Sequence, residues 1–159
     1  MEPSEAWSID VGGDPATQGS KRLVRLRTGR SVMIEQSARV KPWRSTVADA
    51  ARAAGVTVLD GDVAIHVVAR WLRPASHFRK DGRIRPSAPS RPGRGDCDKL
   101  ARAICDALAG IAYRNDRQVA LLAVERVWAS PGEGPGATIG IAPAPAAGVW
   151  TYSEEPTGP

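Results

Sequence analysis

DVAIHVVARWL, residues 62–72, is the stretch from which the fold can be predicted. Its β-branched and aromatic side chains suit a pleated, buried strand. Residues 118–128, QVALLAVERVW, have the same character and predict a second strand. Between the two, residues 98–108 place apolar side chains at spacings of three and four, which predicts an amphipathic helix that ends at Gly110. The middle of the chain is therefore expected to run strand, loop, helix, strand.

The first third of the chain predicts shorter strands. Residues 6–11 suit a strand that is closed by a turn rich in glycine. Residues 23–26 and 31–34 suit a hairpin, because the Thr28-Gly29 pair between them is typical of a tight turn.

Residues 42–54 change to a helical pattern, with a proline in the first turn and Gly55 at the C-terminal end. Residues 137–141 predict a last short strand, and residues 143–159 are rich in Ala, Pro and Gly, which predicts a disordered tail. The order β-β-β-α-β-α-β-β indicates a single α+β or mixed α/β domain over residues 1–142. We expect a small mixed sheet packed with two main helices.

Length and composition exclude several classes of protein. The chain has 159 residues, of which 42% are hydrophobic and 25% charged, as in one globular domain. No apolar run approaches the roughly 18 residues that cross a bilayer, and the first ten residues lack the basic start and apolar core of a secretory signal. Cys97 and Cys105 lack metal-ligand spacing, and on one helix they are about 12 Å apart, too far to bridge. We expect a cytoplasmic protein.

Positive charge is concentrated in two segments. Residues 21–44 hold eight basic residues and one acid, and residues 70–102 hold ten basic residues and three acids. Residues 73–95 combine this charge with four prolines and no apolar periodicity, which predicts a long basic loop. A field of this sign attracts polyanions, of which nucleic acid is the commonest inside cells. The alternative is a basic surface with no specific partner.

Two aspartates, Asp96 and Asp98, lie where this loop meets the helix at residues 98–108, and Asp116 lies between that helix and the next strand. A return strand packed on the helix is expected to bring Asp116 towards the helix start. Three carboxylates at close range repel one another unless a cation shares the site, and Mg²⁺ prefers such hard oxygen ligands. The alternative is structural, because Asp is a common helix N-cap and a common turn residue.

The segment GDCDKLARAICDALAGIAYRNDRQVALLAVERVW, residues 95–128, resembles the core motif of RusA-type Holliday junction resolvases. That motif runs D-x-D-N-L-x-K, then D-A-L with a small residue, then a hydrophobic-Tyr step into D-D-x-Q. Upstream, residues 14–22 (DPATQGSKR) resemble the Q-G-S-K-R loop of the family, and residues 40–44 (VKPWR) resemble the helix start that follows it. The resemblance covers roughly residues 6–141.

The resemblance implies a homodimeric, Mg²⁺-dependent endonuclease that cuts four-way DNA junctions symmetrically in recombination and repair, in a bacterium or phage. It implies that Asp96, Asp98 and Asp116 are the metal-binding catalytic carboxylates. Arg102 stands where the family has a catalytic lysine. Two further departures are Lys99 for an asparagine and Asn115 for the first acid of the D-D pair.

The expected DNA contacts come from both basic segments and from the start of the second helix: Lys21, Arg22, Arg79, Lys80, Arg83, Arg85 and Lys99. The rival hypothesis is a non-catalytic protein of the same fold that binds branched DNA. In that case the departures from the family motif have abolished turnover. Arg keeps the charge of a lysine but does not donate a proton near neutral pH.

Overall fold

The computed structural model describes residues 6–18, 21–35 and 38–146. The predicted order of elements is confirmed, with two short 3-10 turns added. The elements are β1 (Trp7–Gly12), β2 (Lys21–Arg25), β3 (Ser31–Glu35), α1 (Val40–Ala53), β4 (Val63–Trp71), η1 (Ala75–His77), α2 (Cys97–Leu108), η2 (Asp116–Gln118), β5 (Val119–Trp128) and β6 (Gly136–Pro143).

Four strands form the main sheet, in the order β1-β6-β4-β5. β4 and β5 are parallel, whereas β6 is antiparallel to both β4 and β1. Parallel neighbours need a crossover, and α2 supplies it between β4 and β5. The prediction of a small mixed sheet with two main helices is therefore confirmed.

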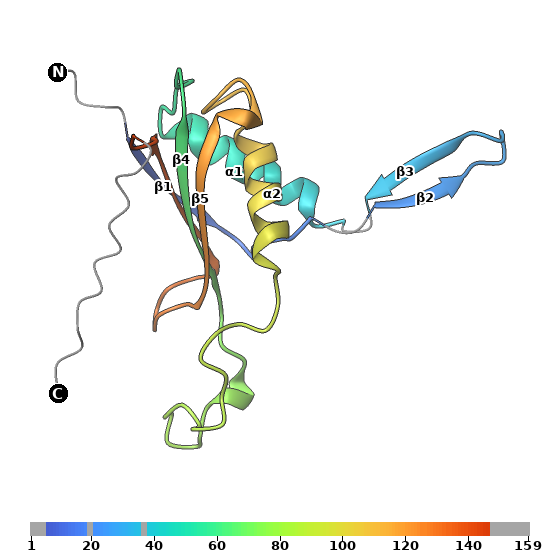
Figure 1. Cartoon of the computed structure of the whole chain (residues 1–159). Helices are drawn as coiled ribbons and strands as arrows, with labels where there is room; N and C mark the ends of the chain where they lie inside the picture. The colour runs from blue at the N-terminus through green and yellow to red at the C-terminus, as the bar shows by residue number, and fades with distance from the viewer. Residues whose placement is uncertain (1–5, 19–20, 36–37, 147–159) are drawn as a thin grey trace.

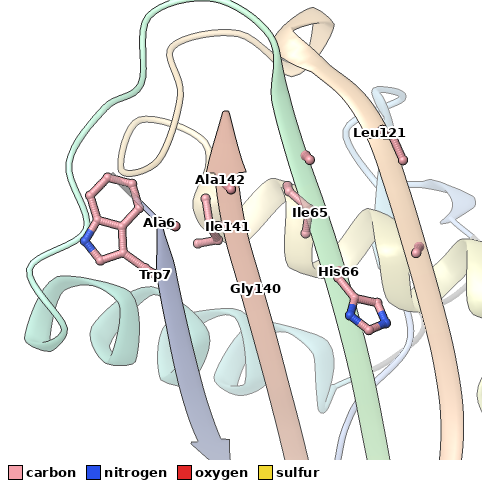
Figure 2. Close-up of a pocket in the computed structure, with 10 residues that line it drawn as sticks. Ala6, Trp7, Ile65, His66, Leu121, Gly140, Ile141 and Ala142 are labelled. Carbon is pink, nitrogen blue, oxygen red and sulfur yellow. The ribbon is translucent and has the colours of Figure 1, made fainter. Parts of the chain in front are cut away.

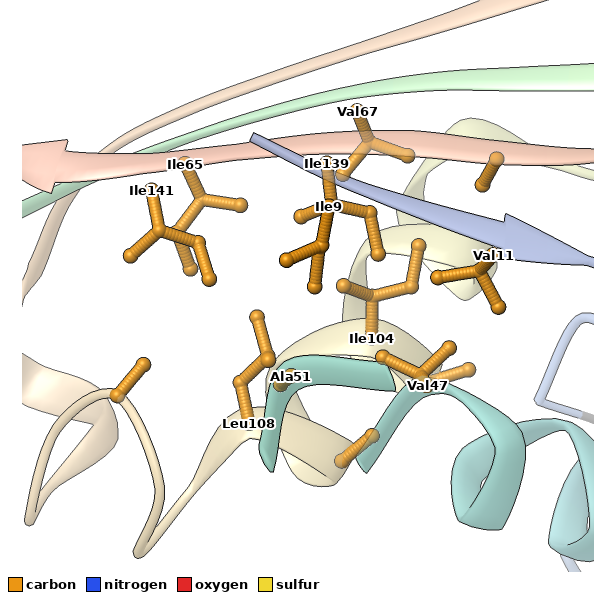
Figure 3. Packing of buried hydrophobic residues seen from close by; sticks show 14 of the residues in the cluster. Ile9, Val11, Val47, Ala51, Ile65, Val67, Ile104, Leu108, Ile139 and Ile141 are labelled. Carbon is orange, nitrogen blue, oxygen red and sulfur yellow. The ribbon is translucent and has the colours of Figure 1, made fainter. Parts of the chain in front are cut away.

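Both helices cover one face of the sheet, and the hydrophobic core lies between the two layers (Figure 1). Alternate residues of the strands point into this layer, because side chains along a strand alternate between its two faces. Figure 3 shows how the sheet side chains meet those of the helices. The labelled members of this cluster are Ile9, Val11, Val47, Ala51, Ile65, Val67, Ile104, Leu108, Ile139 and Ile141.

The hairpin of β2 and β3 is a separate two-stranded sheet. It extends away from the body of the molecule (Figure 1). The predicted turn is present: Gly29 has φ +81°, and its N–H donates to the carbonyl of Leu26 at 2.9 Å. No helix in the described part of the chain is long and apolar enough to cross a membrane.

The end of the chain differs from the prediction at its boundary. β6 extends to Pro143, which pairs with Val63, and the N–H of Ala144 donates to the carbonyl of Asp62 at 2.8 Å. The sheet therefore continues into the segment predicted as the tail, because the antiparallel partner β4 offers hydrogen bonds there. Residues 147–159 of that tail lie outside the described residues.

Candidate active site

A glycine fixes the point at which the basic loop becomes α2. Gly95 has φ +83°, and a Cβ at this position would lie 2.9 Å from the Trp71 ring. Trp71 is buried at the end of β4. Only glycine combines this backbone conformation with so close an approach to a ring. Asp96 and Asp98 are therefore placed directly beside a rigid part of the core.

Asp96 is the N-cap residue of α2, but its side chain accepts no capping hydrogen bond. Its carboxylate instead forms an ion pair with Lys99, at 2.9 Å between Oδ2 and Nζ. The hydrogen bond that Lys99 donates to Asp96 raises the pKa of Lys99, with smaller contributions from the charges of Asp96 and Asp98. The structural alternative for Asp96, a cap that bonds to the helix backbone, is thus not what the structure shows.

Asp98 and Arg102 lie one turn apart on α2, and both are exposed. Within the described part of the chain, neither side chain takes part in a hydrogen bond or an ion pair. An exposed carboxylate next to an exposed guanidinium presents a cation ligand and a phosphate-binding group on one helix face. Lys99 is half-buried beside them and faces Asp96, so all four charged groups gather at the start of α2.

The loop at residues 14–18 lies against the same helix start. The N–H of Gln18 donates to the carbonyl of Lys99 at 3.3 Å. Asp14 accepts hydrogen bonds from Arg94 at 2.8 and 2.9 Å and lies 3.5 Å from Arg39. Two of the segments that resemble the resolvase motifs, about 80 residues apart in the sequence, thus meet in space.

A small cavity of about 100 Å³ lies where these segments meet. It is lined by Pro15, Ala16, Thr17, Arg39, Trp71, Arg94 and Gly95. Arg94 also lies over the Trp71 ring, with its guanidinium carbon 5.9 Å from the ring centroid. Arg39 and Arg94 share the single carboxylate of Asp14, so these three side chains together carry a net positive charge.

Three of these neighbours, Asp14, Arg94 and Arg126, were not singled out from the sequence. Arg126, on β5, donates from Nη1 to the carbonyl of Gly95 at 3.2 Å and so ties the loop end to the sheet. Asp14 lies in the quoted DPATQGSKR segment, and Arg94 lies two residues before Asp96. Their positions in or next to the motifs could have indicated Asp14 and Arg94, whereas nothing in the sequence pointed to Arg126.

The prediction that Asp116 returns to the helix start is wrong. Asp116 opens η2, directly beyond the C-terminal end of α2, and a 12-residue helix is about 18 Å long. β5 begins beside Asp116 and runs back along α2, so it is Arg126, near the end of the strand, that reaches Gly95. Among the described residues, no three His, Cys, Asp or Glu side chains gather as a metal ion would require.

The turn that carries Asp116 is held by its own hydrogen bonds. Asn115 accepts from the N–H of Arg117 at 2.9 Å, and Gln118 Oε1 accepts from the N–H of Asn115 at 3.1 Å. Gln118 Nε2 also donates to the carbonyls of Leu59 and Gly61. Asn115 therefore acts as a turn cap, a role that Asn and Asp fill equally well, which accounts for Asn at this departure from the family motif.

Two further motif residues lie at this second end of α2. Tyr113 is fully buried and donates its hydroxyl hydrogen to the carbonyl of Cys105 at 2.5 Å. Burial raises the pKa of Tyr113. Asp106 is exposed and forms an ion pair with Arg44 of α1. Both contacts hold the C-terminal end of α2 against its neighbours. We therefore assign Tyr113 and Asp106 a role in packing and not in the Asp96 site.

The tip of the basic loop exposes the four predicted DNA contacts Arg79, Lys80, Arg83 and Arg85. A turn shapes this tip: the N–H of Arg79 donates to the carbonyl of Arg83 at 2.8 Å, and Phe78 and Ile84 form an antiparallel bridge. Asp81, the acid at the tip, accepts from the N–H of Arg83 at 3.0 Å. The loop thus presents a compact cluster of cations to solvent.

The base of the loop is anchored on Trp128, at the end of β5. The indole N–H donates to the carbonyl of Pro89 at 2.9 Å, and His77 packs edge-on against the ring at 5.2 Å between centroids. Arg73 lies over the same ring at 5.1 Å. The base positions the loop, and the tip is left to contact a partner.

A hollow of about 570 Å³ lies on the sheet face that carries no helix within the described residues. Figure 2 shows this face, with small side chains around Gly140 and the ring of His66 pointing outward. His66 Nε2 lies 3.2 Å from Glu125 Oε1. The lining is apolar apart from His66 and includes neither Asp96 nor Asp98, so it is not the candidate active site.

The donor set at the start of α2 fits Mg²⁺ in part. Asp96 and Asp98 supply exposed carboxylates two residues apart, and Mg²⁺ is ordinarily held by one or two carboxylates together with water and phosphate oxygens. Asp116 of the same chain does not fit, because α2 separates it from the other two. Lys99 competes for Asp96.

The family comparison covers the elements that build this site. The family model described as endodeoxyribonuclease RusA matches residues 12–142, which include the residue 14–18 loop, both helices, the basic loop and strands β4 to β6. No curated protein matches the chain. Since the match spans well over half of the sequence, the chain belongs to the RusA family of endodeoxyribonucleases.

Proposed function

We propose that this endodeoxyribonuclease is a Mg²⁺-dependent homodimer that resolves four-way DNA junctions by symmetric hydrolysis of phosphodiesters, in the recombination and repair of a bacterium or phage. The observation that carries the proposal is the pair Asp96 and Asp98 at the start of α2. Both carboxylates are exposed, neither caps the helix, and cationic side chains surround them. The whole assembly lies within the matched residues 12–142.

The residues at the helix start have different chemical roles. Asp96 and Asp98 hold the metal, and Mg²⁺, when bound, acidifies a water molecule and stabilises negative charge on the phosphate. Arg102 and Lys99 supply positive charge where the pentavalent phosphate gains negative charge. Arg102 cannot act as the proton donor for the leaving oxygen, because a guanidinium stays protonated near neutral pH. That proton therefore comes from a water molecule or from the Lys99 ammonium.

The proposal takes Asp116, the third carboxylate of the motif, from a second copy of the chain. Within one chain, Asp116 follows the far end of α2, a helix about 18 Å long, and so lies away from the helix start. A homodimer in which the two α2 helices run in opposite directions brings the Asp116 end of one copy to the Asp96 end of the other. Two equivalent sites then arise from one two-fold axis, as symmetric cleavage of a junction needs.

The exposed tip of the basic loop holds the DNA. Arg79, Lys80, Arg83 and Arg85 contact backbone phosphates, which position a duplex without reading its sequence. Lys21 and Arg22 belong to the first basic segment and add to this field. Because the loop runs directly into Gly95 and Asp96, DNA held by its tip approaches the candidate metal ligands.

The deciding experiment is cleavage of a synthetic four-way junction by the purified chain, with Mg²⁺ and with chelator, against a linear duplex of the same sequence. Paired cuts at symmetric positions, dependent on Mg²⁺ and absent from the duplex, support the proposal. One observation favours the rival, a non-catalytic protein that binds branched DNA: the Lys99 ammonium occupies the Asp96 carboxylate. Junction binding without cleavage at any Mg²⁺ concentration would favour that rival.

A further inference from the structure

None of the described side chains of the β2–β3 hairpin belongs to the hydrophobic core. Within the described strands, the two pair only with each other, and Figure 1 shows them extending away from the sheet and helices. An isolated two-stranded hairpin is at best marginally stable in water. An element of this kind gains its order from a partner rather than from the body of the protein.

The described side chains of the hairpin show which partner chemistry it suits. Arg25, Arg27 and Arg30 are all exposed around the turn. Beside them, Leu26 is 44% exposed and Val32 is 40% exposed. The one acid of the hairpin, Glu35, ends β3 opposite Lys21, at the end away from the turn. The guanidinium groups at the turn can bind a polyanion, and no acid lies among them. The apolar side chains between them can pack against the sugars of a nucleic acid.

The place of the hairpin in the chain ties it to the candidate active site. Gln18, whose N–H bonds to the carbonyl of Lys99, precedes β2 by only three residues in the sequence. The hairpin therefore starts beside the start of α2 and extends outward. A five-residue strand spans about 17 Å, which is the length of about five base pairs of duplex.

We propose that the β2–β3 hairpin is a DNA-binding arm that lies along a duplex arm of the junction, beyond the crossover. Arg25, Arg27 and Arg30 bind backbone phosphates, and Leu26 and Val32 pack against deoxyribose. A two-stranded ribbon of this kind is narrow enough to enter the major groove. This inference rests on the proposed function, because it takes junction DNA as the partner.

The test compares the wild-type chain with the triple variant Arg25→Gln, Arg27→Gln, Arg30→Gln. Dissociation constants are measured in chelator for junctions with arms of about 15 base pairs and for junctions with arms of about 5 base pairs. We expect the variant to bind the long-armed junction about tenfold more weakly, with a salt slope flatter by roughly 0.9 for each phosphate that the variant no longer binds. On the short-armed junction the loss should be smaller, because an arm of about five base pairs ends where the turn of the hairpin reaches.

Two controls isolate the hairpin. Arg52→Gln removes one exposed guanidinium from α1, which pairs with Asp49 at 3.1 Å, and should leave affinity for both junctions unchanged. The triple variant Arg25→Lys, Arg27→Lys, Arg30→Lys keeps the charge and should keep most of the affinity for long arms. Thermal melting of all variants should match the wild type, because these side chains are exposed.

Each other outcome overturns the inference. If the wild-type chain binds no junction, both the proposed function and this inference are contradicted. A triple variant that binds both junctions like the wild type removes the inference alone, as does an equal loss of affinity on short and long arms. If the variant instead changes the mass measured by light scattering, the hairpin joins two copies of the chain and is not a DNA arm.

Discussion

Lys99 Nζ lies 2.9 Å from Asp96 Oδ2, across one turn of α2. The RusA-type motif has asparagine at the position of Lys99, so this ion pair is a feature of the present chain. An ammonium group at that distance competes with a metal ion for the same carboxylate oxygen. We therefore expect Lys99 to raise the Mg²⁺ concentration that the site needs for activity.

Replacing Lys99 with asparagine should increase the affinity of the site for Mg²⁺. We expect Lys99→Asn to lower the Mg²⁺ concentration for half-maximal junction cleavage several-fold, because Asp96 loses its cationic partner. Lys99→Arg, which keeps a cation at this position, serves as the control and should stay near the wild type. A Mg²⁺ titration of single-turnover cleavage measures both. Equal half-maximal concentrations for all three proteins would show that the ion pair does not compete with the metal.

Neutralising Asp96 should abolish cleavage without harming the fold. Asp96→Asn keeps the size of the side chain and removes a hard metal ligand, so single-turnover cleavage should fall about a hundred-fold or more. Junction binding in chelator should stay equal or tighten, because one acid facing the phosphates is gone. Since the exposed Asp96 side chain makes no capping hydrogen bond and a surface ion pair contributes little to stability, the melting temperature should be nearly unchanged. Cleavage at the wild-type rate would show that Asp96 does not hold the metal.

The sequence predicted the elements well because their local patterns agree with the tertiary structure. Residues 62–72 and 118–128 carry the β-branched pattern, and β4 and β5 occupy almost the same ranges. The start of the second helix was also predictable, since Gly95 and the two aspartates mark it in the chain itself. These features depend on neighbours in sequence, which a pattern records.

The position of Asp116 was not predictable in this way, because it depends on the direction of a strand relative to a helix. The expectation assumed that the start of the return strand reaches the start of the helix. The chain leaves α2 at its far end, so only the later part of β5 comes back, and Arg126 takes the place expected for Asp116. The contacts of Asp14 with Arg94 and Arg39 are equally non-local.

Gly95→Ala should destabilise the protein and impair the active site together. A Cβ at this position lies 2.9 Å from the buried Trp71 ring, and the φ of +83° is strained for any residue with a side chain. We expect a loss of about 1–3 kcal/mol in the free energy of unfolding, measured by urea denaturation. Gly93→Ala is the control, because nothing lies within 4 Å of its added Cβ. Equal stability of the two variants would contradict the role given to Gly95.

The tip of the basic loop should set the salt dependence of binding. Changing Arg79, Lys80, Arg83 and Arg85 together to glutamine should flatten the log–log salt slope by roughly 0.9 for each phosphate that is no longer neutralised. Arg52→Gln, on an exposed part of α1, should not change the slope. Fluorescence anisotropy with a labelled junction at several salt concentrations gives both slopes. If the quadruple variant keeps the wild-type slope, the loop does not touch DNA.

Mixed dimers should reveal whether each active site draws on two copies of the chain. Asp96→Asn and Asp116→Asn should each inactivate the homodimer. In a heterodimer of the two variants, one site combines both defects, whereas the other combines an intact Asp96 and Asp98 with an intact Asp116. This heterodimer, isolated through two different affinity tags, should nick one strand of the junction but fail to make paired cuts.

A heterodimer of Asp96→Asn with Asp98→Asn is the matched control for this experiment. Both defects lie at the same end of α2, so each of its two sites lacks one carboxylate and no activity should return. If each site were built from one chain, the Asp96→Asn and Asp116→Asn heterodimer would be equally inactive, since each copy would carry its own defect. An Asp116→Asn homodimer with wild-type activity would exclude Asp116 from the site altogether. Recovery of nicking in the first heterodimer alone is therefore the outcome expected if Asp96 and Asp116, which lie at opposite ends of α2 within one chain, meet across the dimer.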